Sequence, residues 1–311
     1  MRQAFRLALW RARTYEAVDA TMALYAPIGL LTLPLVWLFM LLVGYAAMFW
    51  ALGVPDLLTA LDLSGSSLVT LGFVAANGLT QTLLAISEAA LGLILVALFI
   101  AYLPSMYAAF SRREAAVNLL EVRAGAPPWA PELIARYQRI HGLDRLGEVW
   151  TNWETWFVDV EETHTSLAAL VFFRSPQADH SWVTAAGTVL DAASLAASTV
   201  DIPHDSRADL CIRAGYVALR RIADFFSMPY DASPRPDDPI SISRADYDEA
   251  VAHMVANSVP IRGDREQAWR DYAGWRVNYD AVLLGLAELT LAPYAQWSSD
   301  RGTPKQFPRA R

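Results

Sequence analysis

The chain has one cysteine and few charged residues among its 311 residues. Cys211 alone excludes an intrachain disulfide and a cysteine-rich metal site, and it favours a reducing compartment. Charged residues make up 18% of the sequence and hydrophobic residues 54%, which is too apolar for a disordered chain and high for a soluble enzyme. The length gives a prior of about two domains. We therefore expect a folded chain of which one part lies in lipid.

Positive charge is scarce as well. The formal net charge is −7, so the clustered Lys and Arg that phosphate contacts require are missing, and we expect no nucleic-acid partner. Basic residues are absent between Arg13 and Arg112, although arginines precede and follow this stretch. The positive-inside rule then predicts a protein of the cell (inner) membrane with both termini in the cytoplasm.

Two stretches carry no charge at all. The first covers residues 20–55 and is almost wholly apolar over residues 28–52, and the second covers residues 89–111. A helix needs about 20 apolar residues to cross a bilayer. The first run is too long for a cleaved signal peptide. The sequence therefore predicts two membrane spans, preceded by an interfacial or cytosolic helix in residues 1–27, where arginine alternates with apolar side chains.

The connection between the spans is short and too apolar for an ordinary outer loop. Pro55 and Asp56 predict the start of a helix of roughly twelve residues, which cannot cross a bilayer. This helix leads into the string Thr70, Leu71, Gly72. Irregular backbone at membrane depth is tolerated only inside protein or along water. We therefore predict a re-entrant loop over residues 55–76.

The residues at the end of this loop suit a cation. An ion that leaves water needs oxygen ligands in place of its hydration shell, and backbone carbonyls supply them. Thr70 adds a hydroxyl, Gly72 permits backbone conformations that a Cβ hinders, and Leu71 and Phe73 can point back into the protein while their carbonyls face the ion. The expected ligand is a transient potassium ion, with no resident metal or cofactor.

The order of span, short helix, Thr70-Leu71-Gly72-Phe73 and span resembles the pore of the two-transmembrane potassium channel family of pore-loop cation channels. It is similar to bacterial channels of this kind that carry a helical C-terminal domain, and the resemblance covers roughly residues 25 to 115. It implies a homotetramer in a lipid bilayer that passes potassium through its filter and is gated through the second span and the cytosolic domain. It also implies that the protein is not an enzyme.

The sequence departs from the family pattern after Phe73. The next residues are Val74 and Ala75, where the family usually has glycine and aspartate. A β-branched residue disfavours the positive φ that glycine adopts. The departure puts the outermost ion site in question, so a less selective monovalent cation channel is also compatible with the sequence.

Three further residues are candidates for supporting the filter. Ser66 precedes Thr70 by four residues and is placed to hydrogen-bond the filter backbone. Glu88, at the outer end of the second span, braces the filter, sits in the outer mouth or snorkels to water. Gly92 lies where the resemblance implies a gating hinge, although a small residue for close helix packing is an equal alternative.

The pore module of residues 28–124 is followed by a proline-rich linker and by a predicted cytosolic domain, residues 132–297. No convincing strand alternation occurs there, so we predict an all-α domain and, for the whole chain, an all-α fold. The fingerprint G-x-G-x-x-G is absent, and a nucleotide-binding regulatory domain is not implied. The ligand of this domain is unknown. The predicted helices cover about residues 131–141, 145–169, 180–199, 206–227, 244–257 and 264–290.

One cluster in this domain suggests metal chemistry. Glu161 and His164 have the Glu-x-x-His spacing of di-iron bundles, and Glu162 lies between them. Such bundles need a second copy of the motif, which the sequence lacks, so a structural helix is the better interpretation. The alternative for the whole protein is a membrane-anchored helical binding or signalling protein without a pore.

Overall fold

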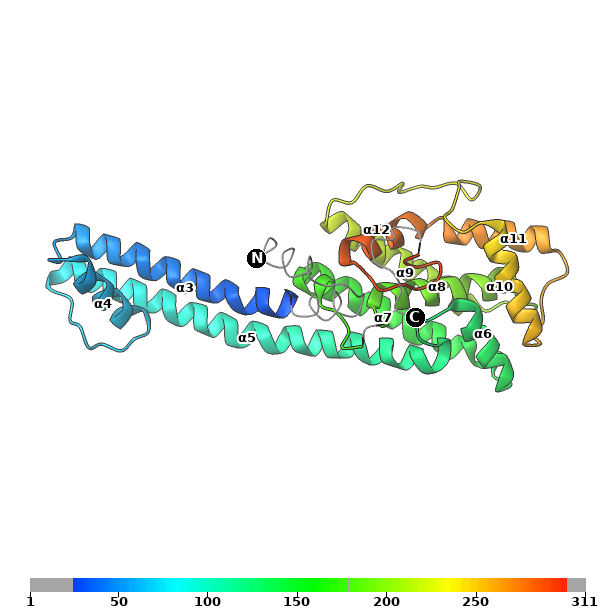
Figure 1. Ribbon diagram of the computed structural model, residues 1–311, viewed down its shortest axis with the longest axis horizontal. Helices are drawn as coiled ribbons and strands as arrows, with labels where there is room; N and C mark the ends of the chain where they lie inside the picture. The colour runs from blue at the N-terminus through cyan, green and yellow to red at the C-terminus, as the bar shows by residue number, and fades with distance from the viewer. Residues whose placement is uncertain (1–24, 178, 301–311) are drawn as a thin grey trace, which may run out of the picture. The chain divides into compact units, whose positions relative to one another are not determined.

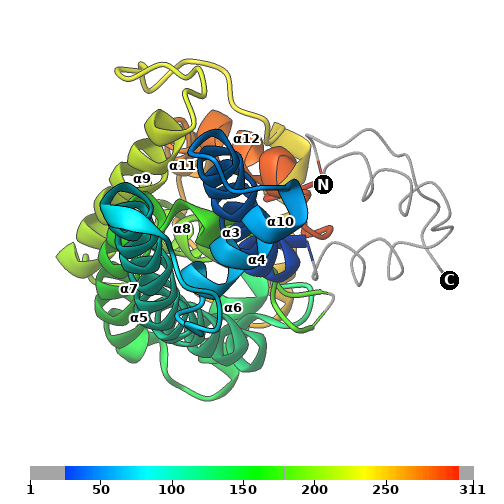
Figure 2. The same cartoon turned by 90° about the vertical axis from the view of Figure 1, so that its left-hand side faces the viewer.

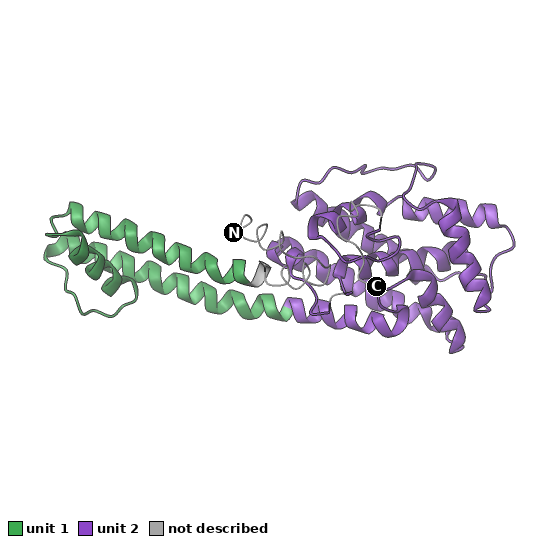
Figure 3. Cartoon of the chain, viewed as in Figure 1, with its two compact units in different colours: residues 1, 24–108 green, residues 2–23, 109–311 purple. Residues whose placement is uncertain are grey.

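The computed structural model describes residues 25–177 and 179–300 (Figure 1). These residues form helices α3 to α12 and two short 3-10 helices, and one isolated bridge pairs Val200 with Ile261. The predicted all-α fold is confirmed for this part of the chain. The described residues divide into two compact units, which Figure 3 colours separately: unit 1, residues 25–108, and unit 2, residues 109–300. The predicted N-terminal helix lies outside the described residues, except that α3 already begins at Tyr25.

Unit 1 contains two helices that are long and apolar enough to cross a membrane. These are α3, Tyr25–Ala51, and α5, Gly78–Ala124, which begins before the predicted second span and continues past the end of unit 1. Pro34 and Pro104 lie inside these helices without ending them. Most of the apolar side chains along both helices are exposed. Their surface is that of a chain that needs lipid or partners around it.

The third helix of unit 1 is short. It is α4, Leu57–Leu68, and Asp56 caps its N-terminus by accepting a hydrogen bond of 2.9 Å from the backbone N–H of Thr59. With 12 residues it is too short to cross a bilayer, as the sequence predicts. It packs against α3 (Figure 1). The small core of this unit gathers there and consists of Tyr45, Ala46, Phe49, Val54, Ala60 and Leu63.

Unit 2 is built around α8, Trp182–Ser198, which is buried along nearly its whole length. Its sequence is rich in Ala, Ser and Thr, and these small side chains let neighbouring helices approach closely. In Figures 1 and 2, α8 lies among other helices of the unit, and α6, α9, α11 and α12 pack on it. The remaining elements are α6 (Ala130–Arg139), η1 (Leu143–Arg145), α7 (Leu146–Ser166), η2 (Ala168–Phe172), α9 (Ser206–Phe225), α10 (Arg244–Ala256), α11 (Arg265–Arg276) and α12 (Asp280–Thr290).

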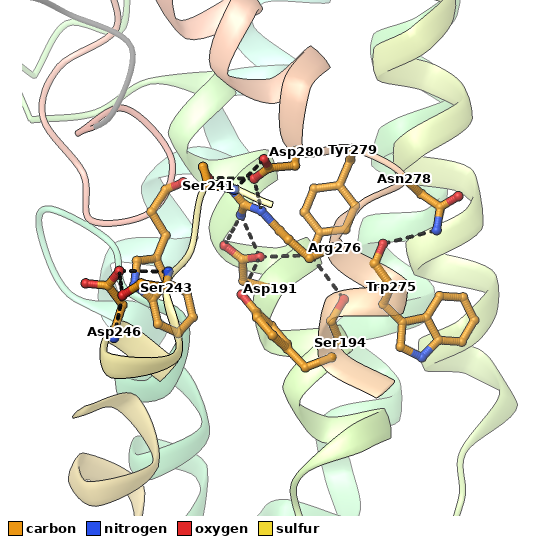
Figure 4. A network of polar contacts seen from close by, with 12 residues as sticks. Asp191, Ser194, Ser241, Ser243, Asp246, Trp275, Arg276, Asn278, Tyr279 and Asp280 are labelled. Atoms are coloured by element: carbon orange, nitrogen blue, oxygen red, sulfur yellow. Dashed lines mark hydrogen bonds and ion pairs between the residues drawn. The ribbon is translucent and has the colours of Figure 1, made fainter. Parts of the chain in front are cut away.

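The prediction of one helix over residues 264–290 is wrong, because two helices occur there. α11 ends at Arg276 and α12 begins at Asp280. The side-chain amide of Asn278 turns back and donates hydrogen bonds to the carbonyls of Gly274 and Trp275, at 3.0 and 3.2 Å, which satisfies the end of α11 (Figure 4). No Gly or Pro marks this break in the sequence.

The break places a buried charge network at the centre of unit 2 (Figure 4). Arg276 is fully buried and donates to both carboxylate oxygens of Asp191 on α8, at 2.7 Å, and to Asp280, also at 2.7 Å. It also donates to the carbonyl of Trp297 at 2.8 Å. Burial lowers the pKa of Arg276, but the negative charges of Asp191 and Asp280 outweigh this and raise the pKa well above its usual value. The network joins α8, α11, α12 and the segment that follows them.

Candidate functional site

The backbone after α4 has an unusual conformation. Thr70 has a φ of 56° and Gly72 a φ of 70°, whereas Leu71 and Phe73 between and after them are outside the positive-φ region. Positive φ is uncommon for a non-glycine residue such as Thr70. A chain that alternates between left- and right-handed residues gathers its N–H groups on one side, and its carbonyls therefore turn to the other side. Alternating φ of this kind at residues 70–73 is the pattern expected of a row of carbonyls that face one side.

Ser66 holds this backbone in place. It lies in the last turns of α4 and is 1% exposed. Its carbonyl accepts hydrogen bonds from the N–H groups of Leu71, at 2.9 Å, and Gly72, at 3.3 Å. Its hydroxyl accepts a third from the N–H of Val74, at 3.1 Å. One residue of the short helix therefore binds three of the N–H groups of residues 71–74, which leaves their carbonyls for another ligand.

The alternation of φ ends at Val74. This residue is not in the positive-φ region, and its N–H is bound to Ser66. A valine here suits the conformation it adopts. The backbone that could offer carbonyls in a row therefore covers residues 70–73 and is not extended by Val74.

The sequence suggested that the side chains of Leu71 and Phe73 can point back into the protein, but in the single chain they do not. Both are 66% exposed. A Cβ added to Gly72 would meet no atom within 4 Å in the chain, so the glycine is explained by its positive φ rather than by crowding within one subunit. Two large apolar side chains are thus exposed in this loop.

Glu88 on α5 is fully buried, and it does not snorkel to water. The hydroxyl of Ser64 on α4, which has a single proton, lies within hydrogen-bonding distance of the carboxyl group of Glu88 and of the carbonyl oxygen of Leu42 on α3, the latter at 2.9 Å. The second carboxyl oxygen of Glu88 has no partner among the described residues. Ser64 thus joins α3, α4 and α5 through polar contacts, and the hydrogen bond of Glu88 is to Ser64 rather than to residues 70–74.

Gly92 lies where α5 crosses the C-terminal end of α4. A Cβ at this position would sit 2.1 Å from the carbonyl oxygen of Leu68. Any other residue would therefore push the two helices apart immediately before Thr70. Close packing explains this glycine, and α5 is helical on both sides of it. A hinge at Gly92 stays a prediction.

The candidate metal ligands in unit 2 have other partners. Glu161 forms an ion pair with Arg221, and His164 is buried with its Nε2 3.1 Å from a guanidinium nitrogen of Arg113. Since arginine can only donate, His164 accepts through Nε2 and carries its proton on Nδ1. Burial and the charge of Arg113 hold the pKa of His164 well below its usual value. No group of three or more possible ligands lies together within residues 25–177 and 179–300.

Arg113 is an important residue that sequence reasoning missed. The sequence used it only as one of the positive charges after the second span. In unit 2 its side chain is 1% exposed, and it donates to the carbonyls of Leu170, at 2.9 Å, and Phe173, at 2.6 Å. It also forms an ion pair with Glu114 at 2.7 Å. No local pattern separates it from its neighbour Arg112, because its partners other than Glu114 lie more than 50 residues away.

Comparison of the chain with protein-family models, with curated proteins and with solved structures finds no match. The functional interpretation therefore depends on the geometry of residues 66–74 and on the two bilayer-length helices on either side of them.

Proposed function

We propose that this chain is one subunit of a homotetrameric channel that lets potassium, or monovalent cations less selectively, cross the cell membrane. The observation that supports it most is the alternating φ of residues 70–73, held from behind by Ser66. Carbonyls turned to one side replace the hydration shell of a cation. Neither the short helix nor the strained Thr70 is needed by a protein that only anchors a soluble domain.

The short helix favours a cation electrostatically. α4 ends at Leu68, two residues before Thr70. The C-terminal end of a helix carries a partial negative charge of about half an elementary charge. A cation at the carbonyls of residues 70–73 would be stabilised by this end of the dipole. An anion would be repelled by it, and the neighbouring carbonyls add to the same effect.

The site is incomplete in one copy, which is why we propose a homotetramer. One chain offers one row of carbonyls and cannot surround an ion. The exposed side chains of Leu71 and Phe73 would be covered by the neighbouring subunit, together with part of the apolar surface of α3 and α5. By the positive-inside rule, the arginines that precede the first span and follow the second in the sequence support a cytoplasmic location of both termini.

The conformation of Val74 supports weaker selectivity than the family pattern gives. Because the positive-φ alternation stops before it, the outermost carbonyl ring would not be formed as it is when glycine follows Phe73. Fewer ordered rings discriminate less between potassium and sodium. We expect Val74→Gly to raise the selectivity for potassium over sodium, measured as the ratio of ion fluxes into liposomes.

The decisive experiment measures the mass of the assembled protein and the potassium flux that it carries. Native mass measurement of the full chain in mild detergent should give a tetramer, and the reconstituted tetramer should carry potassium down its gradient. Gly72→Ala should abolish flux, because a residue with a Cβ resists a φ of 70°, while assembly persists. Gly44→Ala is the matched control, because its new Cβ would meet nothing within 4 Å in ordinary helix.

A different result would favour the alternative. A monomer or dimer without flux would leave the two spans as an anchor for unit 2, and the protein would then be a membrane-anchored helical binding or signalling protein. Flux that survives Gly72→Ala would place the ion path elsewhere in the molecule.

A further inference from the structure

Unit 2 contains a cavity that the proposed channel function does not use. Its volume is about 370 Å³, and it lies where the start of α7, the end of α8 and the segment before α9 come together. Small-molecule sites have volumes of roughly 300–1,000 Å³ and combine an apolar lining with a few polar groups. This cavity has both the size and the mixed lining of such a site.

The inner wall of the cavity is apolar. Trp150 is 1% exposed, and Leu146, Ala196 and Ala208 beside it are also buried. Polar side chains belong to the outer wall, because the side chains of His204 and Arg207 are 64% and 50% exposed. A ligand with an apolar body and a polar end would place the body against Trp150 and the polar end at the mouth.

Arg207 is held in a defined position at this mouth. Its Nε donates to both carboxylate oxygens of Asp205, at 2.8 and 3.1 Å. Its guanidinium lies over Gly147 in the first turn of α7, where a Cβ would come within 2.0 Å of the guanidinium carbon. The glycine therefore makes room for the arginine. Within the described part of the chain, the two terminal nitrogens of Arg207 have no hydrogen-bond partner.

Arg262 lines the same cavity and is fixed in a similar way. Its backbone N–H donates to the carbonyl of Thr199 at 3.0 Å, and its Nη1 donates to the carbonyl of Ser198 at 3.2 Å. Its Nε and Nη2 make no hydrogen bond to the described residues. Each arginine is thus anchored by one side-chain nitrogen and keeps others for a ligand.

The unused hydrogen-bonding capacity of the wall consists mainly of donors. Asp205 and Arg207 form an ion pair without net charge, in which the terminal nitrogens of Arg207 remain available as donors, and His204 is 3.2 Å from Asp209 outside the lining. Asp144, which is exposed, is the remaining acid of the lining. Guanidinium groups match the planar, two-oxygen geometry of a carboxylate. We infer that this cavity binds a small organic carboxylate with an apolar or aromatic body.

The inference does not depend on the proposed pore, and its test measures binding alone. The probe is para-trifluoromethylbenzoate, followed by fluorine NMR with the full chain in detergent. The neutral para-trifluoromethylbenzamide and the cationic para-trifluoromethylbenzylamine serve as comparison ligands. We expect saturable binding of the carboxylate and weaker binding of both analogues.

Three variants test the location of this binding. Arg207→Gln and Arg262→Gln should each weaken it by about tenfold, because each removes a charge-assisted hydrogen bond. Ala197→Leu should block it, because Ala197 is a partly exposed residue of the lining and the larger side chain fills the space. Arg235→Gln is the matched control and should leave binding unchanged, since the side chain of Arg235 is 81% exposed and lies outside the cavity.

Several results would overturn the inference. These are no saturable binding of the carboxylate, equal or tighter binding of the amide or the amine, and binding that survives both the arginine variants and Ala197→Leu. Repeating the titration with Gly72→Ala protein keeps the question separate from conduction, because that variant changes the pore and leaves the cavity intact.

Discussion

The two units differ in the kind of polar side chain that they bury. Unit 1 buries three polar side chains, Ser64, Ser66 and Glu88, and all of them lie on α4 or against it. Unit 2 buries full charges, and it supplies each with partners of its own, as Arg113 and Arg276 show. In unit 1 the polar groups serve one short helix and the loop after it. In unit 2 they join helices that are distant in sequence.

The remaining surface differs as well. α3 and α5 leave most of their large apolar side chains exposed, and so does the loop at Leu71 and Phe73. Unit 2 has a continuous core from α5 to the segment after α12. This contrast teaches that unit 2 has a core of its own, whereas unit 1 exposes an apolar surface that needs lipid or protein around it. Substitutions should therefore act on unfolding in unit 2 and on assembly in unit 1.

The largest effect should come from the buried arginine at the start of unit 2. Arg113→Leu would leave the buried Glu114 without its ion-pair partner and the Phe173 carbonyl without its donor, and should lower the free energy of unfolding by about 3–5 kcal/mol. Arg112→Gln is the matched control. Arg112 is 57% exposed and pairs with Asp159 at 3.0 Å, which is worth at most about 1 kcal/mol. Denaturant unfolding followed by tryptophan fluorescence measures both, and equal losses would contradict the distinction.

In unit 1, the close crossing of α5 and α4 should be the most sensitive point. Gly92→Ala places a Cβ against the backbone of Leu68, and overpacking of this kind costs about 1–3 kcal/mol. We expect a lower melting temperature of the tetramer and reduced flux. Gly44→Ala, in open space on α3, should leave the tetramer unchanged or stabilise it slightly, by about 1 kcal/mol or less. Similar behaviour of the two variants would argue against the packing role of Gly92.

The contribution of the contact between Ser64 and Glu88 to stability should depend on hydrogen bonding rather than on the negative charge of Glu88. Glu88→Gln keeps a group that can bond to Ser64, and it should retain assembly and flux. Glu88→Ala removes one of the two partners of the buried Ser64 hydroxyl and should cost about 1–2 kcal/mol. Thermal dissociation of the tetramer, measured for both variants, gives the comparison. If Glu88→Gln were as damaging as Glu88→Ala, the negative charge itself would be required.

The smallest effect concerns the pH dependence of unit 2. Because the pKa of His164 is held well below 6.5 in the folded state, the unfolded chain takes up a proton first as the pH falls. The contribution of neutral His164 to the free energy of unfolding is complete above pH 6.5. Below pH 6.5 it declines by about 1.4 kcal/mol for each pH unit until the pKa of the folded state is reached. Unfolding at pH 7.5 and 5.5 should show this loss. It should disappear in His164→Gln and persist in His204→Gln, since His204 is exposed.

Much of the architecture could be predicted because it depends on local patterns. Uncharged runs of bilayer length predict the two long helices, and the Pro55-Asp56 start predicts α4, whose cap is the carboxylate of Asp56. The string from Thr70 to Phe73 contains two residues with positive φ, Thr70 and Gly72. Helical propensity, hydropathy and capping act over a few turns, so they can be predicted from neighbouring residues in the sequence.

The candidate site was predicted less completely. Ser66 lies where the sequence placed it, but the sequence could not show that it binds three backbone groups. The burial of Glu88, which excludes snorkelling, depends on a contact with Ser64, more than 20 residues away in the chain. The close packing that explains Gly92 depends on Leu68, which is also more than 20 residues away. The break between α11 and α12 follows from a side-chain cap at Asn278, which no Gly or Pro announces.

The sequence by itself determined that the chain is helical, that two of its helices can span a bilayer and that a short helix with an unusual loop lies between them. Only the tertiary structure decided which of two adjacent arginines is exposed and which is buried. Arg112 and Arg113 have the same chemistry and the same local surroundings in sequence. Arg113 is buried because acceptors on α7, on η2 and directly after η2, from 51 to 60 residues away, satisfy it, and a buried charge is stable only where such partners meet it in three dimensions.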